Sequence, residues 1–417
     1  MPDPIALVRN PEWMDASTRP ACKYSPVVVH KAQTPGAIVS MQDALKKRIA
    51  VCKSMAGAKN DTWFSFLRAG PSHEPHLRSS NVPVIVISGG SAKKLAIDLC
   101  SDYSLAWHPI NLRNEPLYLL VHKLDFNNYA QAMSRVMAQF RNMHLIGWSG
   151  GGMTGFGAAR AAALAFADTL PYRPQRILMM DQDVIQTEVT RHTNPIVQRQ
   201  LDGIHQTKRI AGLGVGYPTR VPVPKQVFPR EIKAGDRVVG IREPIPAPNK
   251  PDFNSPAQQF VSIQAPFRKI AQKTPGLVAM DDGIYPAYMV GGGEDMLMGM
   301  QQQLNEGDEN AALLPGRILK KALPAKPQDK SNEYWNTARV NTLAALYAAE
   351  KDTRIDFEGK SMTIELLIKY FFDLGCLTDL NGPDAHNASA CIIERIILRL
   401  HKLGAFPADV DGTVFSH

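Results

Sequence analysis

The sequence contains short, uninterrupted apolar runs separated by stretches with helical spacing. The runs predict strands at Val82–Ile87, Leu117–His122, Met143–Trp148 and Ile177–Met180. The stretches between them predict helices over Ala92–Cys100, Asn128–Phe140 and Ala158–Leu170. Strands that alternate with helices imply crossover connections, and apolar runs without polar alternation suit strands covered on both faces. We therefore predict an α/β fold with a mostly parallel, Rossmann-like sheet and flanking helices.

The same patterns divide the chain into three parts. Residues 1–80 carry weak signals and are predicted to form an N-terminal extension that packs on the core. Residues 81–305 hold the α/β domain. Within that domain the proline-dense stretch 218–275 is predicted to be an irregular excursion, with a β-ribbon around 237–242. Residues 306–417 contain amphipathic patterns and are predicted to form a small helical C-terminal region.

Composition and charge limit the function only loosely. The 417 residues carry a formal charge of +8, and the basic residues are dispersed, whereas nucleic-acid binders usually concentrate them on one face. The five cysteines form no CxxC pair, which argues against a disulfide framework or a cysteine zinc site. Neither a bilayer-spanning apolar run nor a signal-peptide core is evident, so we expect a cytoplasmic protein.

The candidate chemistry follows the last predicted strand, which runs directly into Asp181-Gln-Asp183. In parallel α/β sheets, ligands bind beyond the carboxyl ends of the strands. Two carboxylates two residues apart at such an end can converge on one Mg²⁺ or Mn²⁺, which needs only one or two carboxylates when substrate phosphates complete its shell. An isolated Asp-x-Asp is often only a turn that caps a helix, so its neighbours decide the interpretation.

Three neighbouring features favour a functional interpretation. The glycine cluster Gly150–Gly157 opens a helix, whose backbone N–H groups are expected to face an anion. Arg160 lies in the first turn of that helix, where a cation needs an anionic partner such as a diphosphate or a metal-binding carboxylate. Downstream, Gly291–Asp295 combines a flexible backbone with two acids at a predicted helix start, although helix capping alone would explain Glu294 and Asp295.

Taken in order, these motifs resemble the large inverting GT-A glycosyltransferase superfamily of the family-two type. Gly155-Phe-Gly-Ala-Ala-Arg160 is similar to its Gly-x-x-x-Ala-Arg helix, Asp181-Gln-Asp183 to its Asp-x-Asp strand end, and Gly293-Glu-Asp295 to its later Glu-Asp pair. The resemblance covers roughly residues 80–305 and rests on three short motifs. The chain departs from the pattern at Ala161, where the family usually has Asn, and it lacks a clear Gln/Arg-x-x-Arg-Trp motif.

The resemblance implies a GT-A-like fold and metal-dependent transfer of a sugar from a nucleotide-sugar, with a UDP-sugar favoured. It implies that Asp181 and Asp183 hold Mn²⁺ or Mg²⁺ and the donor diphosphate, with Asp183 the more direct ligand. Gly155, Gly157, Arg160 and Gly293 would belong to the donor site together with Asp181.

On the acceptor side, the resemblance implies an inverting displacement. Asp295, or as second choice Glu294, would be the base that deprotonates the acceptor. The 218–275 excursion would lie on this side. The acceptor itself stays open among a peptide or protein, a modified nucleic-acid base and a small metabolite.

Other interpretations remain open at this point. A nucleotidyltransferase would use a similar platform and paired acids, and a non-catalytic module that binds protein or nucleic acid would use neither. The first nucleotide-binding strand is either Val82–Ser88 or Leu117–His122, and the second choice places a loop over Lys123–Asn127 at the base-binding position. His192 is expected to lie in a solvated loop close after the acids.

Overall fold

The computed structural model describes most of the predicted α/β domain and parts of both ends of the chain. The described residues are 5–9, 27–29, 47, 50–51, 54–57, 63–69, 76–101, 105–112, 115–192, 194–208, 210–214, 218–221, 238–241, 256–265, 267, 311–314, 318–321, 341, 343–357, 359–373, 379–382, 385–386 and 389.

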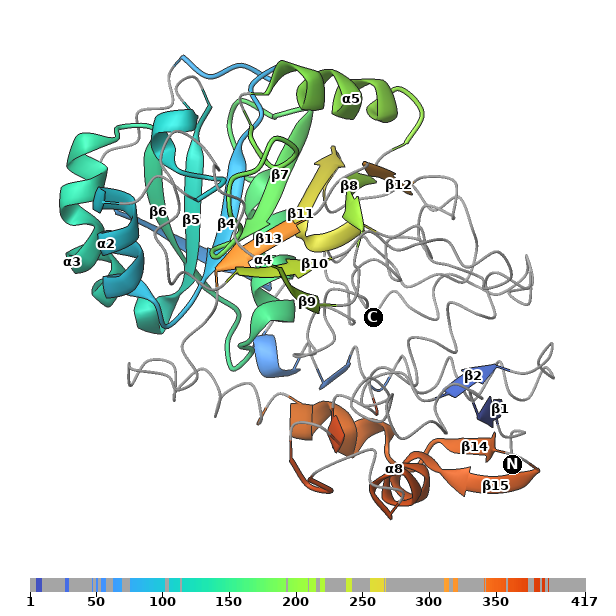
Figure 1. Ribbon diagram of the computed structural model, residues 1–417. Coiled ribbons are helices and arrows are strands. Elements are labelled where there is room, and N and C mark those ends of the chain that lie inside the picture. The colour runs from blue at the N-terminus through green and yellow to red at the C-terminus, as the bar shows by residue number, and fades with distance from the viewer. Residues whose placement is uncertain are drawn as a thin grey trace.

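One large mixed sheet forms the centre of the described structure (Figure 1). Across this sheet, the described strands are β12 (Ala311–Leu314), β8 (Ile210–Gly214), β11 (Pro256–Gln264), β7 (Arg176–Asp181), β4 (Val84–Ser88), β5 (Leu117–His122), β6 (Met143–Ser149) and β3 (Ser65–Ala69). The neighbours β7, β4, β5 and β6 run parallel, while β11 and β3 pair antiparallel with them. The predicted α/β fold with a mostly parallel sheet is therefore confirmed.

Helices cover both faces of this sheet. They are α2 (Ala92–Ser101), α3 (Lys123–Gln139) and α4 (Phe156–Asp168). Leu119 of β5 shares a core cluster with Tyr129 of α3, whereas the adjacent Tyr118 contacts Phe166 of α4, with ring centroids 5.0 Å apart. Because successive side chains of a strand point to opposite faces, α3 and α4 lie on opposite sides of the sheet. This double cover explains why β4 and β5 are buried along their whole length.

The structure corrects the predicted irregular stretch over 218–275. Residues 256–264 form β11, which lies between β7 and β8, with Phe260 opposite Met180. Proline stands only at the first residue of this strand, where a missing N–H is tolerated, so the high proline density of the whole stretch hid it. The predicted ribbon around 237–242 is confirmed, because β10 (Val238–Ile241) pairs antiparallel with β9 (Pro218–Val221) and β13 (Ile318–Lys321).

Residues near the N-terminus and residues 354–363 meet in a second, smaller sheet. Its described strands are β15 (Lys360–Thr363), β14 (Arg354–Phe357), β1 (Ile5–Arg9) and β2 (Val27–Val29), and helix α8 (Ile364–Asp373) packs on β14 and β15. This sheet lies apart from the main sheet (Figure 1). The region 306–417, predicted to be helical, thus contains helix α8 but also four described strands, β12 to β15, which its amphipathic helical patterns did not predict.

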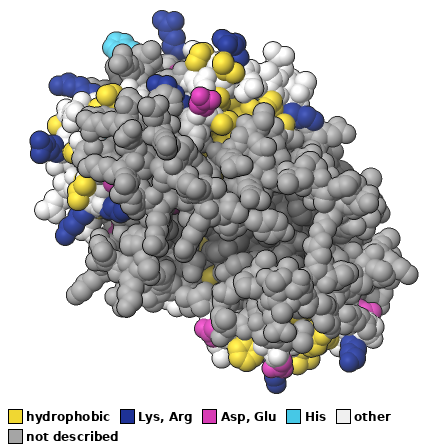
Figure 2. All heavy atoms as spheres, in the orientation of Figure 1, with side chains coloured by type: hydrophobic (Ala, Val, Ile, Leu, Met, Phe, Trp, Pro, Cys, Tyr) yellow, Lys and Arg dark blue, Asp and Glu magenta, His cyan; other side chains and the backbone are white. Residues whose placement is uncertain are grey.

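The visible surface agrees with the dispersed charge of the sequence. On the face shown in Figure 2, the described Lys and Arg side chains lie at separate places around the outline and form no single patch. No helix in the described part of the chain is long and apolar enough to span a membrane.

Candidate functional site

The strand order reverses direction between β4 and β7. From β4 the chain passes through α2 to β5 and through α3 to β6 on one side, and it then returns through α4 to β7 on the other side. In open α/β sheets such a reversal marks the place where ligands bind, beyond the carboxyl ends of the strands. The two segments at this place are Ser88–Ser91 after β4 and Asp181–Asp183 at the end of β7. Two strands, Val82–Ser88 and Leu117–His122, were candidates for the first nucleotide-binding strand of the predicted fold. The strand order favours Val82–Ser88, because this segment contains β4, the strand at the reversal.

The paired acids lie at this reversal in a tight turn. Asp181 is the last residue of β7, opposite Ile87 of β4, and the Val184 N–H donates back to the Asp181 carbonyl oxygen at 3.4 Å. Asp183 is only 9% exposed. A continuing strand would keep these two carboxylates on one face but roughly 7 Å apart along the strand, whereas a turn can bring them closer to a common ligand.

Gln182, between the two acids, ties the turn to the end of β4. Its Oε1 accepts a hydrogen bond from Ser88 Oγ, and its Nε2 donates to Ser91 Oγ at 3.2 Å. Its carbonyl oxygen accepts from Trp107 Nε1 at 3.1 Å. The side chain and the backbone of the middle residue are therefore both anchored, which restricts the positions available to the acids on either side.

The Ser88–Ser91 loop is itself held from α3. Tyr129 OH lies 2.6 Å from Ser88 Oγ and accepts from the Ser91 N–H at 3.0 Å, and the Gly90 N–H donates to Asp125 Oδ2 at 2.9 Å. Sequence analysis did not identify Tyr129 and Asp125, because they lie on a helix and look like ordinary helical residues. Lys123–Asn127, suggested as a loop, is the first turn of α3 instead, with His122 Nδ1 accepting from the Leu124 N–H at its N-cap.

Arg160 finds its anionic partner in Asp181. Its Nη2 donates to Asp181 Oδ1 at 2.9 Å, and the arginine side chain is 1% exposed. A guanidinium buried this deeply is stabilised only when it is paired and hydrogen-bonded. The sequence expectation of a carboxylate partner is thus met by the first acid of the pair, which leaves Asp183 as the acid on the far side of the turn.

The glycine cluster before α4 is used differently from the sequence expectation. The Gly152 N–H donates to the Met55 carbonyl oxygen at 2.7 Å, and a Cβ on Gly151 would lie 2.2 Å from that same oxygen. Gly151 also has φ +62°. Part of the cluster therefore accommodates the backbone of residues 55–56 rather than an anion.

The end of the cluster nearest the acids begins α4. Gly155 is the N-cap residue, with φ 96° and no side-chain cap, and Gly157 is buried in the first turn. A side chain at Gly155 would be strained at this φ. Gly155 and Gly157 thus leave out a side chain on either side of Phe156 at the start of α4. Their donor-site role stays a prediction.

The chemistry of the two acids fits a hard divalent cation. Asp181 and Asp183 supply carboxylate oxygens, the ligands that Mg²⁺ and Mn²⁺ prefer, and a cation with substrate phosphates needs no more than two of them. Among the described residues, no three His, Cys, Asp or Glu side chains converge as a self-sufficient metal site. Gly293, Glu294 and Asp295 lie outside the described residues.

His192 is not in a solvated loop, which corrects the sequence expectation. It is 7% exposed, and burial lowers its pKa to about 4, with Arg176 lowering it further. It is therefore neutral at pH 7. It lines a cavity with Arg176 at the beginning of β7, the end opposite to the acids, and does not belong to the candidate site.

No protein-family model matches the sequence, and no curated protein matches it. Among solved structures, the chain is similar to 4-diphosphocytidyl-2C-methyl-D-erythritol synthase from Anaerococcus prevotii, with 10% identity and a TM-score of 0.29. The match covers 63% of this chain and 95% of that one. The fold and the site rest on the strand order and the contacts described above.

Proposed function

We propose that the protein is a metal-dependent glycosyltransferase that moves a sugar from a nucleotide-sugar, with a UDP-sugar favoured, to an acceptor nucleophile. One observation carries the proposal. Asp181 and Asp183 stand at the reversal of strand order between β4 and β7, with Arg160 paired to Asp181 and Gln182 anchoring the turn. A parallel sheet binds ligands at this position, and paired acids there suit a cation that bridges a diphosphate.

In this proposal each residue of the turn has a separate task. Asp183, with Asp181, would hold Mn²⁺ or Mg²⁺, and the cation supplies neutralisation of the charge on the leaving nucleoside diphosphate. Arg160 orients Asp181 and keeps the positive charge of the guanidinium close to the same place. Gln182 restrains the turn, so that the acids need little reorganisation when the donor binds.

The acceptor half of the proposal comes from the sequence resemblance. Asp295, with Glu294 as second choice, would take the proton from the acceptor nucleophile as it attacks the anomeric carbon. In an inverting displacement the bond to the nucleoside diphosphate breaks on the opposite side. The acceptor is a peptide or protein, a modified base or a small metabolite.

The test is a thermal-shift screen of nucleoside diphosphates, nucleotide-sugars and nucleoside triphosphates, with and without Mn²⁺. A ligand at 100 times its Kd stabilises the folded state by about 2.7 kcal/mol, which gives a measurable rise in Tm. We expect one nucleotide-sugar and its diphosphate to raise the Tm only when Mn²⁺ is present. Asp183→Ala should abolish this metal-dependent shift while leaving the Tm without ligand close to that of the unchanged protein.

The matched control is Glu188→Ala, which removes an exposed acid from the same segment and should leave the shift intact. Release of pyrophosphate from a triphosphate, without consumption of any nucleotide-sugar, would assign the site to nucleotidyl transfer instead. An undiminished shift in Asp183→Ala would remove the proposed role of the paired acids. A chain that shows no metal-dependent shift with any nucleotide would fit the non-catalytic binding module.

A further inference from the structure

A polar cavity lies at the amino ends of the parallel strands, opposite to the candidate site at their carboxyl ends. Its volume is about 930 Å³, within the range of small-molecule sites. Val82 and Glu115 precede β4 and β5, and Arg176 begins β7, so the cavity opens where the parallel strands start. Helix α5 (Pro195–His205) supplies Gln198 and Asp202 to the same wall. The strand-end acids therefore take no part in it.

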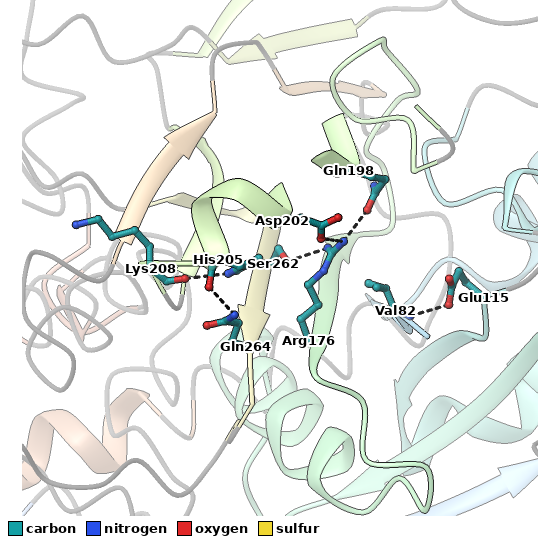
Figure 3. Close-up of polar contacts among 9 residues, drawn as sticks. All are labelled: Val82, Glu115, Arg176, Gln198, Asp202, His205, Lys208, Ser262 and Gln264. Carbon is teal, nitrogen blue, oxygen red and sulfur yellow. Dashed lines mark hydrogen bonds and ion pairs between the residues drawn. The ribbon is translucent and has the colours of Figure 1, made fainter. Parts of the chain in front are cut away.

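Arg176 organises this wall (Figure 3). Its Nη2 donates to Gln198 Oε1 and to Asp202 Oδ1, each at 2.9 Å, and its Nη1 donates to Ser262 Oγ at 3.4 Å. Burial lowers the pKa of this guanidinium, and the carboxylate of Asp202 opposes that effect. Arg176 thus finds its hydrogen-bond acceptors within the protein. Its bond to Oε1 fixes the orientation of the Gln198 amide.

Two buried polar atoms in the wall have no hydrogen-bond partner in the described part of the protein. They are Nδ1 of His192, whose side chain is 7% exposed, and Nε2 of Gln198. Because Gln198 Oε1 accepts from Arg176, its amide nitrogen is the end left to donate. Buried polar atoms are nearly always hydrogen-bonded, and an unsatisfied one costs about 1–3 kcal/mol. A bound molecule that supplies both partners would remove this cost.

The charges of the wall identify the kind of molecule. The described lining contains the cations Arg176 and Arg191 and the carboxyl groups Glu115 and Asp202, which balance formally, and burial keeps His192 neutral at pH 7. The described part of the wall therefore carries equal numbers of formal positive and negative charges. The described lining also holds no Phe, Tyr or Trp side chain on which a nucleobase would stack.

A hydroxyl group matches the two unpartnered atoms. It donates and accepts at the same time, so it serves a neutral imidazole nitrogen in either tautomer and also accepts from an amide N–H. We propose that this cavity binds a neutral, hydroxyl-rich small molecule, a sugar or a cyclic polyol, which hydrogen-bonds to His192 Nδ1 and Gln198 Nε2. The site is separate from the proposed donor site, and it stands whether or not the protein transfers sugars.

The experiment measures binding of glucose, trehalose and myo-inositol by calorimetry and saturation-transfer NMR, with citrate and inorganic phosphate as anionic probes. We expect saturable binding of at least one neutral probe and none of the anions. His192→Phe and Gln198→Leu should each weaken that binding about fivefold or more, which is the loss of roughly one hydrogen bond. Gln198→Glu is a second variant that keeps an acceptor for Arg176 and removes the amide donor.

The control is Gln200→Leu, the same change at an exposed position of α5 that does not line the cavity, and it should bind as the unchanged protein does. Asp183→Ala should also retain the binding, which separates this test from that of the donor site. Binding of the anions alone would overturn the proposal. The proposal would also be overturned if the His192 and Gln198 variants bound the neutral probe as tightly as the unchanged protein does. The same holds if no neutral probe binds saturably up to about 50 mM, a concentration that would detect even weak sites.

Discussion

Arg160 and Asp181 show how far single residues of the candidate site depend on one another. The guanidinium is almost completely buried, and its Nη2 lies 2.9 Å from the carboxylate of an acid that is 16% exposed on its side chain. The pair joins α4 to the end of β7, two elements on different layers of the fold. Gln182 adds a second tie, from the same turn to Ser88 and Ser91 at the end of β4. The turn is therefore held from both sides.

The ion pair can be tested by breaking it in two ways. Arg160→Met should lower the free energy of unfolding by about 2–3 kcal/mol, because it leaves the Asp181 carboxylate partly buried without its cation. Combining it with Asp181→Asn should recover part of that loss, because removal of both charges costs less than removal of one. Urea unfolding of both single variants and the double variant measures the coupling. A double variant whose loss equals the sum of the single losses would show that the pair is not coupled.

Prediction from sequence was uneven at this scale. Asp181, Asp183 and Arg160 were identified because acids and a cation beside an apolar strand and a glycine cluster are unusual enough to be noticed. Tyr129 and Asp125 were not identified, because only the packing of α3 against β4 brings them to the Ser88–Ser91 loop. The metal- and donor-binding roles of Asp181, Asp183 and Arg160 stay predictions, as do the roles of Glu294 and Asp295.

At the scale of elements, the glycine cluster between β6 and α4 and the strand β11 illustrate two kinds of structural constraint. Gly151 is close to the backbone of residues 55–56, a contact between segments about ninety positions apart that no local pattern reveals. β11 enters the main sheet beside β7 although the surrounding sequence is rich in proline. Both depend on partners that are remote along the chain.

The contact at Gly151 leads to a paired prediction. Gly151→Ala should destabilise the protein by about 2 kcal/mol or more, since its φ is +62° and the new Cβ would lie 2.2 Å from the Met55 carbonyl oxygen. Gly152→Ala places its Cβ at an ordinary 3.5 Å from the same oxygen and should be close to neutral. Hydrogen exchange at residues 54–57, together with the unfolding free energy, measures both effects. Equal protection and stability in the two variants would contradict the tight approach.

At the scale of the whole molecule, buried histidines couple stability to pH. Burial lowers the pKa values of His122, His192 and His205 to about 4 from the ordinary 6.5. For His122, the carboxylate of Asp125 opposes the shift and Lys123 adds to it. The unfolded chain therefore binds protons more readily than the folded protein between pH 6.5 and 4. The contribution of these histidines to the stability of the folded protein is fully present above pH 6.5 and is lost as the pH falls through this window.

The expected result is a free energy of unfolding that falls between pH 6.5 and 4, by up to about 3 kcal/mol for each such histidine. His122→Asn provides a matched variant, because Asn accepts the same N-cap hydrogen bond but does not titrate. It should give a shallower fall over this range, measured by urea unfolding at a series of pH values. The same slope in both proteins would show that His122 does not contribute.

The sequence by itself determined the class of the fold and the succession along the chain of the strands β4, β5, β6 and β7. It did so because apolar runs and helical spacing are local properties of the chain. It also determined where the paired acids stand, because Asp181 and Asp183 follow directly on a buried strand. Only the tertiary structure decided that β7 lies beside β4 and that β11 lies between β7 and β8. It also decided that Arg160 reaches Asp181 and that His192 faces a separate cavity. Each of these depends on contacts between segments far apart in the chain, and these contacts form only when the layers pack together.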